Sequence, residues 1–123
     1  MKFLQLTTLY PDMLKDLFLN YTDYNSIKYL DVTKKIKDSF VESQRWHYYL
    51  SEKNFQSENF IVNDYFSQSI WCKTNGINIK SRKDWYFEII SHQINFYKPD
   101  ILFLSSESLL NESQINLIKS NFS

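Results

Sequence analysis

The stretch WYFEIISHQINFYKPDILFLSSESL, residues 85–109, decides the fold class of this chain. Trp85, Ile89 and Phe96 recur at helical spacing, and Pro99 ends the helix because the residue before a proline avoids helical geometry. The apolar run ILFL that follows, residues 101–104, predicts a strand buried on both faces. A helix that leads directly into such a strand is typical of a parallel sheet, and we expect this strand to lie at the centre of the sheet.

The rest of the chain alternates in the same way. Further strands are predicted over residues 2–9 and 59–63, and helices from Pro11, from about 26 to 53, over 65–74 and over 111–121. Asp64 is expected to cap the helix over 65–74, and Gly76 to end it in the left-handed conformation. The order β-α-α-β-α-α-β-α predicts a three-layer Rossmann-like α/β fold, with a short parallel sheet of about three strands flanked by helices. Residues 1–123 are expected to form a single domain.

Composition excludes several functional classes. The 14 Lys and Arg residues balance the 14 Asp and Glu residues, so the basic excess of a nucleic-acid binder is missing. A single glycine leaves no room for a GxGxxG fingerprint or a Walker A loop. A single cysteine, Cys72, rules out a disulfide framework, and we expect it to be a buried small apolar residue. The N-terminal apolar stretch is too short for a signal peptide or a membrane span, so we expect a cytoplasmic protein.

Polar residues follow each predicted strand, where open parallel sheets collect their ligands. Hydroxyl, amide and carboxylate groups there are candidates for hydrogen-bonding a polar ligand, with a tyrosine stacking on an apolar face of that ligand. The candidate ligand-binding residues are Thr7, Thr8, Tyr10, Asn63, Asp64, Tyr65, Ser105, Ser106 and Glu107. The alternative is purely structural: Asp64 caps a helix and the two serines close a turn.

No catalytic residue can be named from the sequence. His47 and His92 are the only imidazoles, and both are interpreted as packing or helix-surface residues. Without a third ligand at a suitable spacing, we expect no metal site. Asp100 and Glu107 lie at opposite ends of the strand over 101–104, too far apart for an acid/base pair.

Four stretches in order carry a resemblance to a known family. They are LYPDMLKDLF (9–18), RWHYYL (45–50), FIVNDYFSQSIWCKTNGI (60–77) and DWYFEIISHQINFYKPDILFL (84–104). Together the chain resembles, from about Phe3 to Glu107, the N-terminal Rossmann-like domain of bacterial GT-B glycosyltransferases of the spore-maturation-related (CgeB-like) type. Enzymes of that family have two Rossmann-like domains facing each other across a cleft, and chains roughly three times as long.

The resemblance implies a domain on the acceptor side of such a cleft, with a sugar or glycan acceptor as its partner. The donor nucleotide-sugar would be held by a C-terminal domain that this chain lacks, so the chain alone is expected to be inactive and to hold no cofactor. The alternative is a small stand-alone module for protein interaction or regulation. The open edges of a three-stranded sheet would then favour self-association into a homo-oligomer.

Overall fold

A computed structural model describes residues 1–10, 12–13, 15, 28–37, 49–80, 83–104 and 110–122. The elements follow in the order β1 (Lys2–Thr7), α2 (Tyr29–Lys37), β2 (Gln56–Ile61), α4 (Tyr65–Thr74), α5 (Trp85–Tyr97), β3 (Ile101–Leu104) and α6 (Glu112–Phe122). Residues 49–52 are also helical, as expected for the end of the segment from 26 to 53. The predicted helix that starts at Pro11 falls largely outside the described residues.

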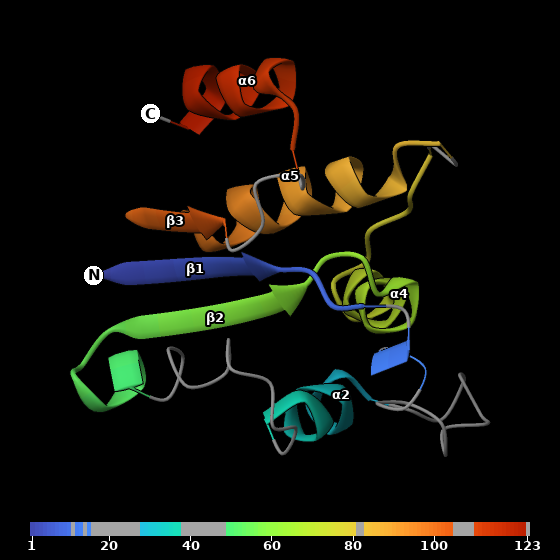
Figure 1. Ribbon diagram of the computed structural model, residues 1–123, viewed down its shortest axis with the longest axis vertical. Coiled ribbons are helices and arrows are strands. Elements are labelled where there is room, and N and C mark those ends of the chain that lie inside the picture. The colour runs from blue at the N-terminus through green and yellow to red at the C-terminus, as the bar shows by residue number, and fades with distance from the viewer. Residues whose placement is uncertain are drawn as a thin grey trace.

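The three strands form one parallel sheet in the order β2-β1-β3 (Figure 1). Thr7 pairs with Ile61 at the end of β2, and Leu6 pairs with Leu104 at the end of β3, so the three carboxyl ends meet at one edge. Helices lie between successive strands in the chain, as parallel pairing requires. The predicted Rossmann-like α/β class, with a small parallel sheet flanked by helices, is confirmed.

The predicted place of β3 was wrong. It is an edge strand, and β1 is the central one. Ile101 and Phe103 are 41% and 44% exposed, whereas Leu102 and Leu104 on the other face of the strand are half-buried. An apolar run satisfies a buried central strand and an exposed edge strand equally well, because strand order depends on contacts between distant parts of the chain.

β2 starts and ends earlier than predicted, at Gln56 and Ile61 instead of at residues 59 and 63. Its first four residues, QSEN, are polar and have no strand-like composition, but they pair residue by residue with β1. Parallel pairing uses backbone groups, so the ladder tolerates polar side chains at its start. The first strand likewise ends at Thr7 rather than at residue 9.

The bounds of α4 match the prediction because both of its ends are determined locally. The Asp64 carboxylate accepts a hydrogen bond of 2.9 Å from the backbone N–H of Ser67, which caps the first turn. At the other end Gly76 has φ of +68°, and the N–H of Ile77 returns to the carbonyl of Cys72 at 2.9 Å. This left-handed ending with a backward hydrogen bond is a Schellman motif.

Helix α5 also ends where the sequence predicts. Lys98, just before Pro99, is left-handed with φ of +47°, and its N–H reaches the carbonyl of Ile94 at 2.8 Å. The proline prevents the helix from continuing.

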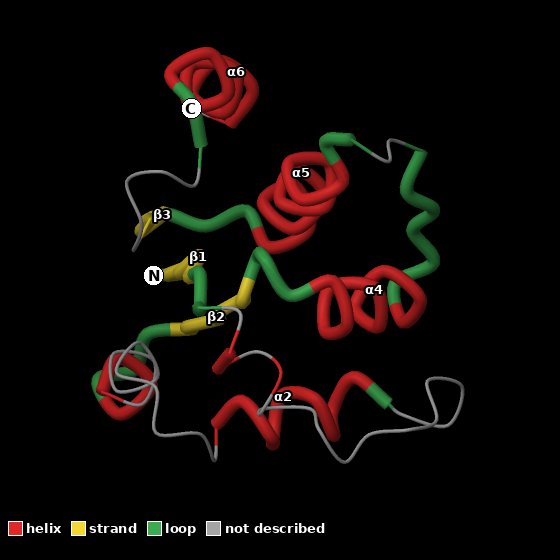
Figure 2. Tube along the Cα trace, turned by 45° about the vertical axis from the view of Figure 1, so that its right-hand side comes forward, coloured by secondary structure: helices red, strands yellow, loops and turns green. Residues whose placement is uncertain are grey.

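Helices α4 and α5 lie together on one side of the sheet, α2 lies beside β2, and α6 lies beyond β3 (Figure 2). The main core forms between the sheet, α4, α5 and α6. Its buried members are Leu4, Leu6, Phe60, Val62, Trp71, Cys72, Ile89, Ile90, Ile94, Leu110 and Ile118. A smaller cluster of Leu9, Val32, Ile61 and Ile70 holds α2 to the end of β2. Phe96, predicted on the apolar stripe of α5, is 58% exposed, and Gln93 is buried instead.

Candidate functional site at the carboxyl edge of the sheet

The side chain of Asn63 joins the loop after β2 to the loop after β1. The Asn63 amide donates to the carbonyl of Leu9 at 2.7 Å, and its oxygen accepts from the N–H of Leu9 at 3.1 Å. Just before it, the N–H of Val62 bonds to the carbonyl of Thr7 at 2.9 Å. The side chain of Asn63 therefore continues the pairing of the two strands past their ends. The structure brings these two predicted loops together, and Asn63 uses both of its amide atoms to do so.

Thr7 points into the protein rather than toward solvent. Its side chain is buried, and its hydroxyl donates to the Oδ1 atom of Asn59 at 3.0 Å. Gln5 lies on the same face of β1, two residues earlier, and pairs in register with Asn59. Among the described residues, Gln5 Oε1 and Asn59 Nδ2 are buried atoms without a hydrogen-bond partner. Sequence reasoning did not foresee this polar row, because the strand was interpreted as buried and partly apolar, with no partner assigned to its polar residues.

Asp64 is 7% exposed, and its carboxylate faces the first turn of α4. Burial raises the pKa of this carboxyl above its usual range, and hydrogen bonds from Ser67 partly oppose the shift. The alternative to ligand binding that the sequence offered for Asp64 is therefore confirmed: its carboxylate caps α4. The capping geometry leaves the carboxylate little surface from which to contact a ligand.

Besides Asn63, whose amide is already bonded to Leu9, three of the candidate side chains at this edge are open to solvent. Tyr10 is 78% exposed, Tyr65 is 61% exposed, and Thr8 is half-buried. The Tyr65 ring contacts Trp85 edge to face, with centroids 5.1 Å apart. Trp85 opens α5, where the sequence placed it on the apolar stripe of the helix, and the structure leaves it half-buried, packed against the main core and in contact with Tyr65. We call Thr8, Tyr10, Tyr65 and Trp85 the aromatic edge.

The other predicted candidates do not join this edge. Ser105, Ser106 and Glu107 lie outside the described residues, as does His47. His92 is exposed on α5, as the helix-surface interpretation predicts. Cys72 is buried as predicted, and burial, with a smaller contribution from Glu88, raises the pKa of its thiol to about 11. A thiol with this pKa is not a nucleophile near neutral pH.

A polar pair inside the protein was also missed. Gln68 of α4 and Gln93 of α5 are 1% and 0% exposed and hydrogen-bond reciprocally, at 2.7 and 3.3 Å between amide nitrogen and oxygen. The pair joins the two helices across the core. Its only signal in the sequence was a glutamine at an apolar position in each helical stripe.

Within the described ranges, no three His, Cys, Asp or Glu side chains are grouped closely enough to hold a metal ion. No helix in the same ranges is long and apolar enough to cross a membrane. What the aromatic edge offers is two exposed phenol rings with their hydroxyls, an indole and a threonine hydroxyl. This arrangement suits contact with a small polar molecule that has an apolar face.

Comparison of the chain with models of known protein families, with curated proteins and with solved structures found no match in any of the three. The resemblance to GT-B glycosyltransferases therefore stays a prediction.

Proposed function

We propose that this chain is the acceptor-side Rossmann-like domain of a glycosyltransferase, which binds a sugar or glycan acceptor and does not transfer the sugar alone. The observation that carries the proposal is the aromatic edge at the carboxyl ends of parallel strands, the position where open α/β sheets bind their ligands. Asn63 supports it by holding the two loops at a fixed distance.

The residue types at this edge fit a sugar. The faces of sugar rings carry C–H groups that pack on aromatic rings, and their hydroxyls bond to phenol and threonine oxygens. Tyr65 is held in place by Trp85, so its ring is oriented before a ligand arrives. Tyr10 and Thr8 supply the hydroxyls from the first loop. The donor nucleotide-sugar would be bound by a second domain.

Saturation-transfer difference NMR on the purified chain tests this proposal. Glucose, galactose and N-acetylglucosamine serve as acceptor probes, and uridine diphosphate serves as the donor probe. We expect saturation transfer from the protein to at least one of the sugars and none to uridine diphosphate. Tyr65→Ala is expected to abolish the signal, whereas Tyr49→Ala, at a tyrosine 56% exposed on another part of the surface, keeps it. The absence of any sugar signal, or a signal that survives Tyr65→Ala combined with Tyr10→Ala, would contradict the proposal.

A further inference from the structure

An apolar groove lies between α5, β3 and α6, and no residue of the aromatic edge lines it. Its volume is about 630 Å³, within the range of about 300–1,000 Å³ that is typical of small-molecule sites. The aliphatic side chains that line it are all buried or half-buried: Ile94, Leu102, Leu104, Leu110, Ile115 and Ile118. None of these side chains can form a hydrogen bond, so the groove suits the apolar part of a ligand.

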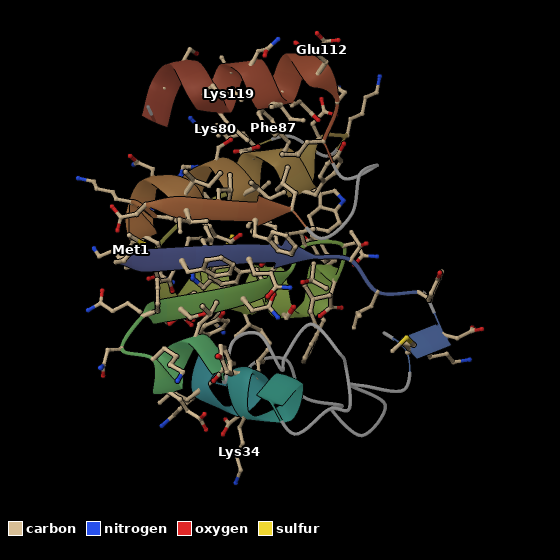
Figure 3. The ribbon with its side chains drawn as sticks, turned by 60° about the vertical axis from the view of Figure 1, so that its left-hand side comes forward. Met1, Lys34, Lys80, Phe87, Glu112 and Lys119 are labelled. Atoms are coloured by element: carbon tan, nitrogen blue, oxygen red, sulfur yellow. The ribbon has the colours of Figure 1, made fainter. Side chains whose placement is uncertain are left out.

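The polar residues of the groove gather at one end of it. α5 leads directly into β3, and α6 runs back along β3, so the last turns of both helices lie beside the start of that strand (Figure 1). Figure 3 shows α6 running from Glu112 toward Lys119, against the direction of the strands. The polar lining residues come from these last turns and from the start of β3, and all are exposed: Asn95, Lys98, Asp100, Lys119 and Asn121. The groove therefore has an exposed polar mouth and an apolar interior.

Two ammonium groups, those of Lys98 and Lys119, belong to this mouth. Within the described part of the chain, no carboxylate forms an ion pair with either of them. The Asp100 carboxylate also lines the mouth, but its Oδ2 atom accepts the backbone N–H of Lys2 at 2.7 Å. Lysines near the end of a helix also complement the negative end of its dipole. A comparison of ligand headgroups separates that role from the binding of an anion.

We propose that this groove binds a free alkyl carboxylate, with its chain in the groove and its carboxylate at the mouth near Lys98 and Lys119. Contact with the aliphatic lining removes the chain from water, which supplies most of the binding free energy. The carboxylate stays close to solvent, where the ammonium groups attract it without the cost of burying a charge. Asn95 and Asn121 add amide N–H donors at the same end. The inference does not depend on the proposed function.

A methyl NMR titration of the purified chain, labelled at its isoleucine and leucine methyl groups, tests the proposal. The probes are decanoate, decanol and decyltrimethylammonium, which share one alkyl chain and differ in headgroup charge, each kept below the concentration at which it aggregates. We expect decanoate to shift the methyl signals of Leu104, Ile115 and Ile118, which line the groove. The signals of Leu30, which is 77% exposed on α2, should not move. Decanol should bind at least about fivefold more weakly than decanoate, and decyltrimethylammonium more weakly still.

Replacing both lysines tests the position of the headgroup. Lys98→Gln combined with Lys119→Gln should weaken decanoate binding about five- to tenfold and leave decanol binding unchanged, because decanol carries no charge. Lys34→Gln is the matched control, because Lys34 is an exposed lysine of α2, on the other side of the sheet from α6 (Figure 3). It should leave the binding of both ligands unchanged.

Ile115→Trp tests the position of the chain, because the larger side chain fills part of the groove. It should weaken the binding of decanoate and decanol alike, by at least about tenfold. Leu117→Trp is the matched control on the same helix, since Leu117 is 50% exposed and does not line the groove. Far-UV circular dichroism checks that each variant is folded, and the titration of the unmodified chain needs no variant.

The proposal is overturned if decanoate moves none of the methyl signals of the groove. It is also overturned if decanol or decyltrimethylammonium binds as tightly as decanoate, because the lysines then serve only the helix ends. Decanoate binding that survives the double glutamine variant, or that survives a folded Ile115→Trp variant, overturns it as well.

Discussion

Replacing Gln68 with methionine tests the energetic role of the buried glutamine pair between α4 and α5. Methionine has nearly the same length and flexibility, so the change removes the amide with little change in volume. The single substitution leaves the Gln93 amide buried with neither its oxygen nor its nitrogen paired to Gln68. Each buried group without a partner costs about 1–3 kcal/mol, so we expect the free energy of unfolding to fall by about 2–4 kcal/mol.

Gln93→Met should cost a similar amount for the same reason. The double variant removes both amides together and leaves no group unsatisfied, so we expect its stability to lie within about 1 kcal/mol of the natural chain. The sum of the two single losses in free energy of unfolding should therefore exceed the loss in the double variant by more than about 2 kcal/mol. This non-additivity separates a paired contact from two independent packing positions.

Urea unfolding followed by far-UV circular dichroism measures all four proteins of the cycle, with the slope of the transition as a check on two-state behaviour. Gln5→Met is the matched control. Gln5 is 2% exposed, and its Oε1 atom has no hydrogen-bond partner among the described residues, so this change should be neutral or stabilising. Single variants of the pair that cost no more than Gln5→Met would refute the reasoning. So would a double variant that loses the sum of both.

Two further predictions concern titratable groups. Asp64→Ala should lower the free energy of unfolding by about 1 kcal/mol through loss of the cap on α4, whereas Asp64→Asn keeps an acceptor oxygen. Burial raises the pKa of the Asp64 carboxyl in the folded chain, so the folded chain binds this proton more tightly than the unfolded chain does. The resulting stabilisation is complete below the unfolded pKa of about 3.9 and is lost as pH rises through the folded pKa. Urea unfolding at several pH values should therefore show Asp64→Asn gaining stability relative to the natural chain as pH increases, and a constant difference would contradict this. The Cys72 thiol, buried and with a pKa of about 11, should react with a chromogenic disulfide far more slowly in the folded chain than in guanidinium, and equal rates would count against it.

The start of α4 and the ends of α4 and α5 were predictable from the sequence because short-range chemistry determines them. The start of α4 depends on the reach of the Asp64 side chain to a backbone N–H three residues later, and its end depends on the conformational freedom of Gly76. Pro99 determines the end of α5 in the same way. Each of these signals lies within a few residues of the feature that it controls.

The candidate site was predictable only in part. The sequence indicated correctly that the loops after β1 and β2 would meet, since the carboxyl ends of parallel strands share an edge. It did not reveal which of their side chains would be available. Asn63 is exposed, but its amide bonds to the backbone of Leu9, and Thr7 is buried and bonds to Asn59. The side chains left to contact a ligand are those of the aromatic edge. The hydrogen bonds of Thr7 and Asn63 join residues more than fifty positions apart.

The sequence by itself determined the α/β class, because strands that alternate with helices favour parallel pairing through helical crossovers. The tertiary structure decided the order of the strands. ILFL has the same apolar pattern at the centre of a sheet and at its edge, and only the pairing of β1 with both neighbours shows that β3 is an edge strand. The tertiary structure likewise turned two separate glutamines into a pair, because a buried amide keeps its hydrogen bonds only where another element supplies the partner.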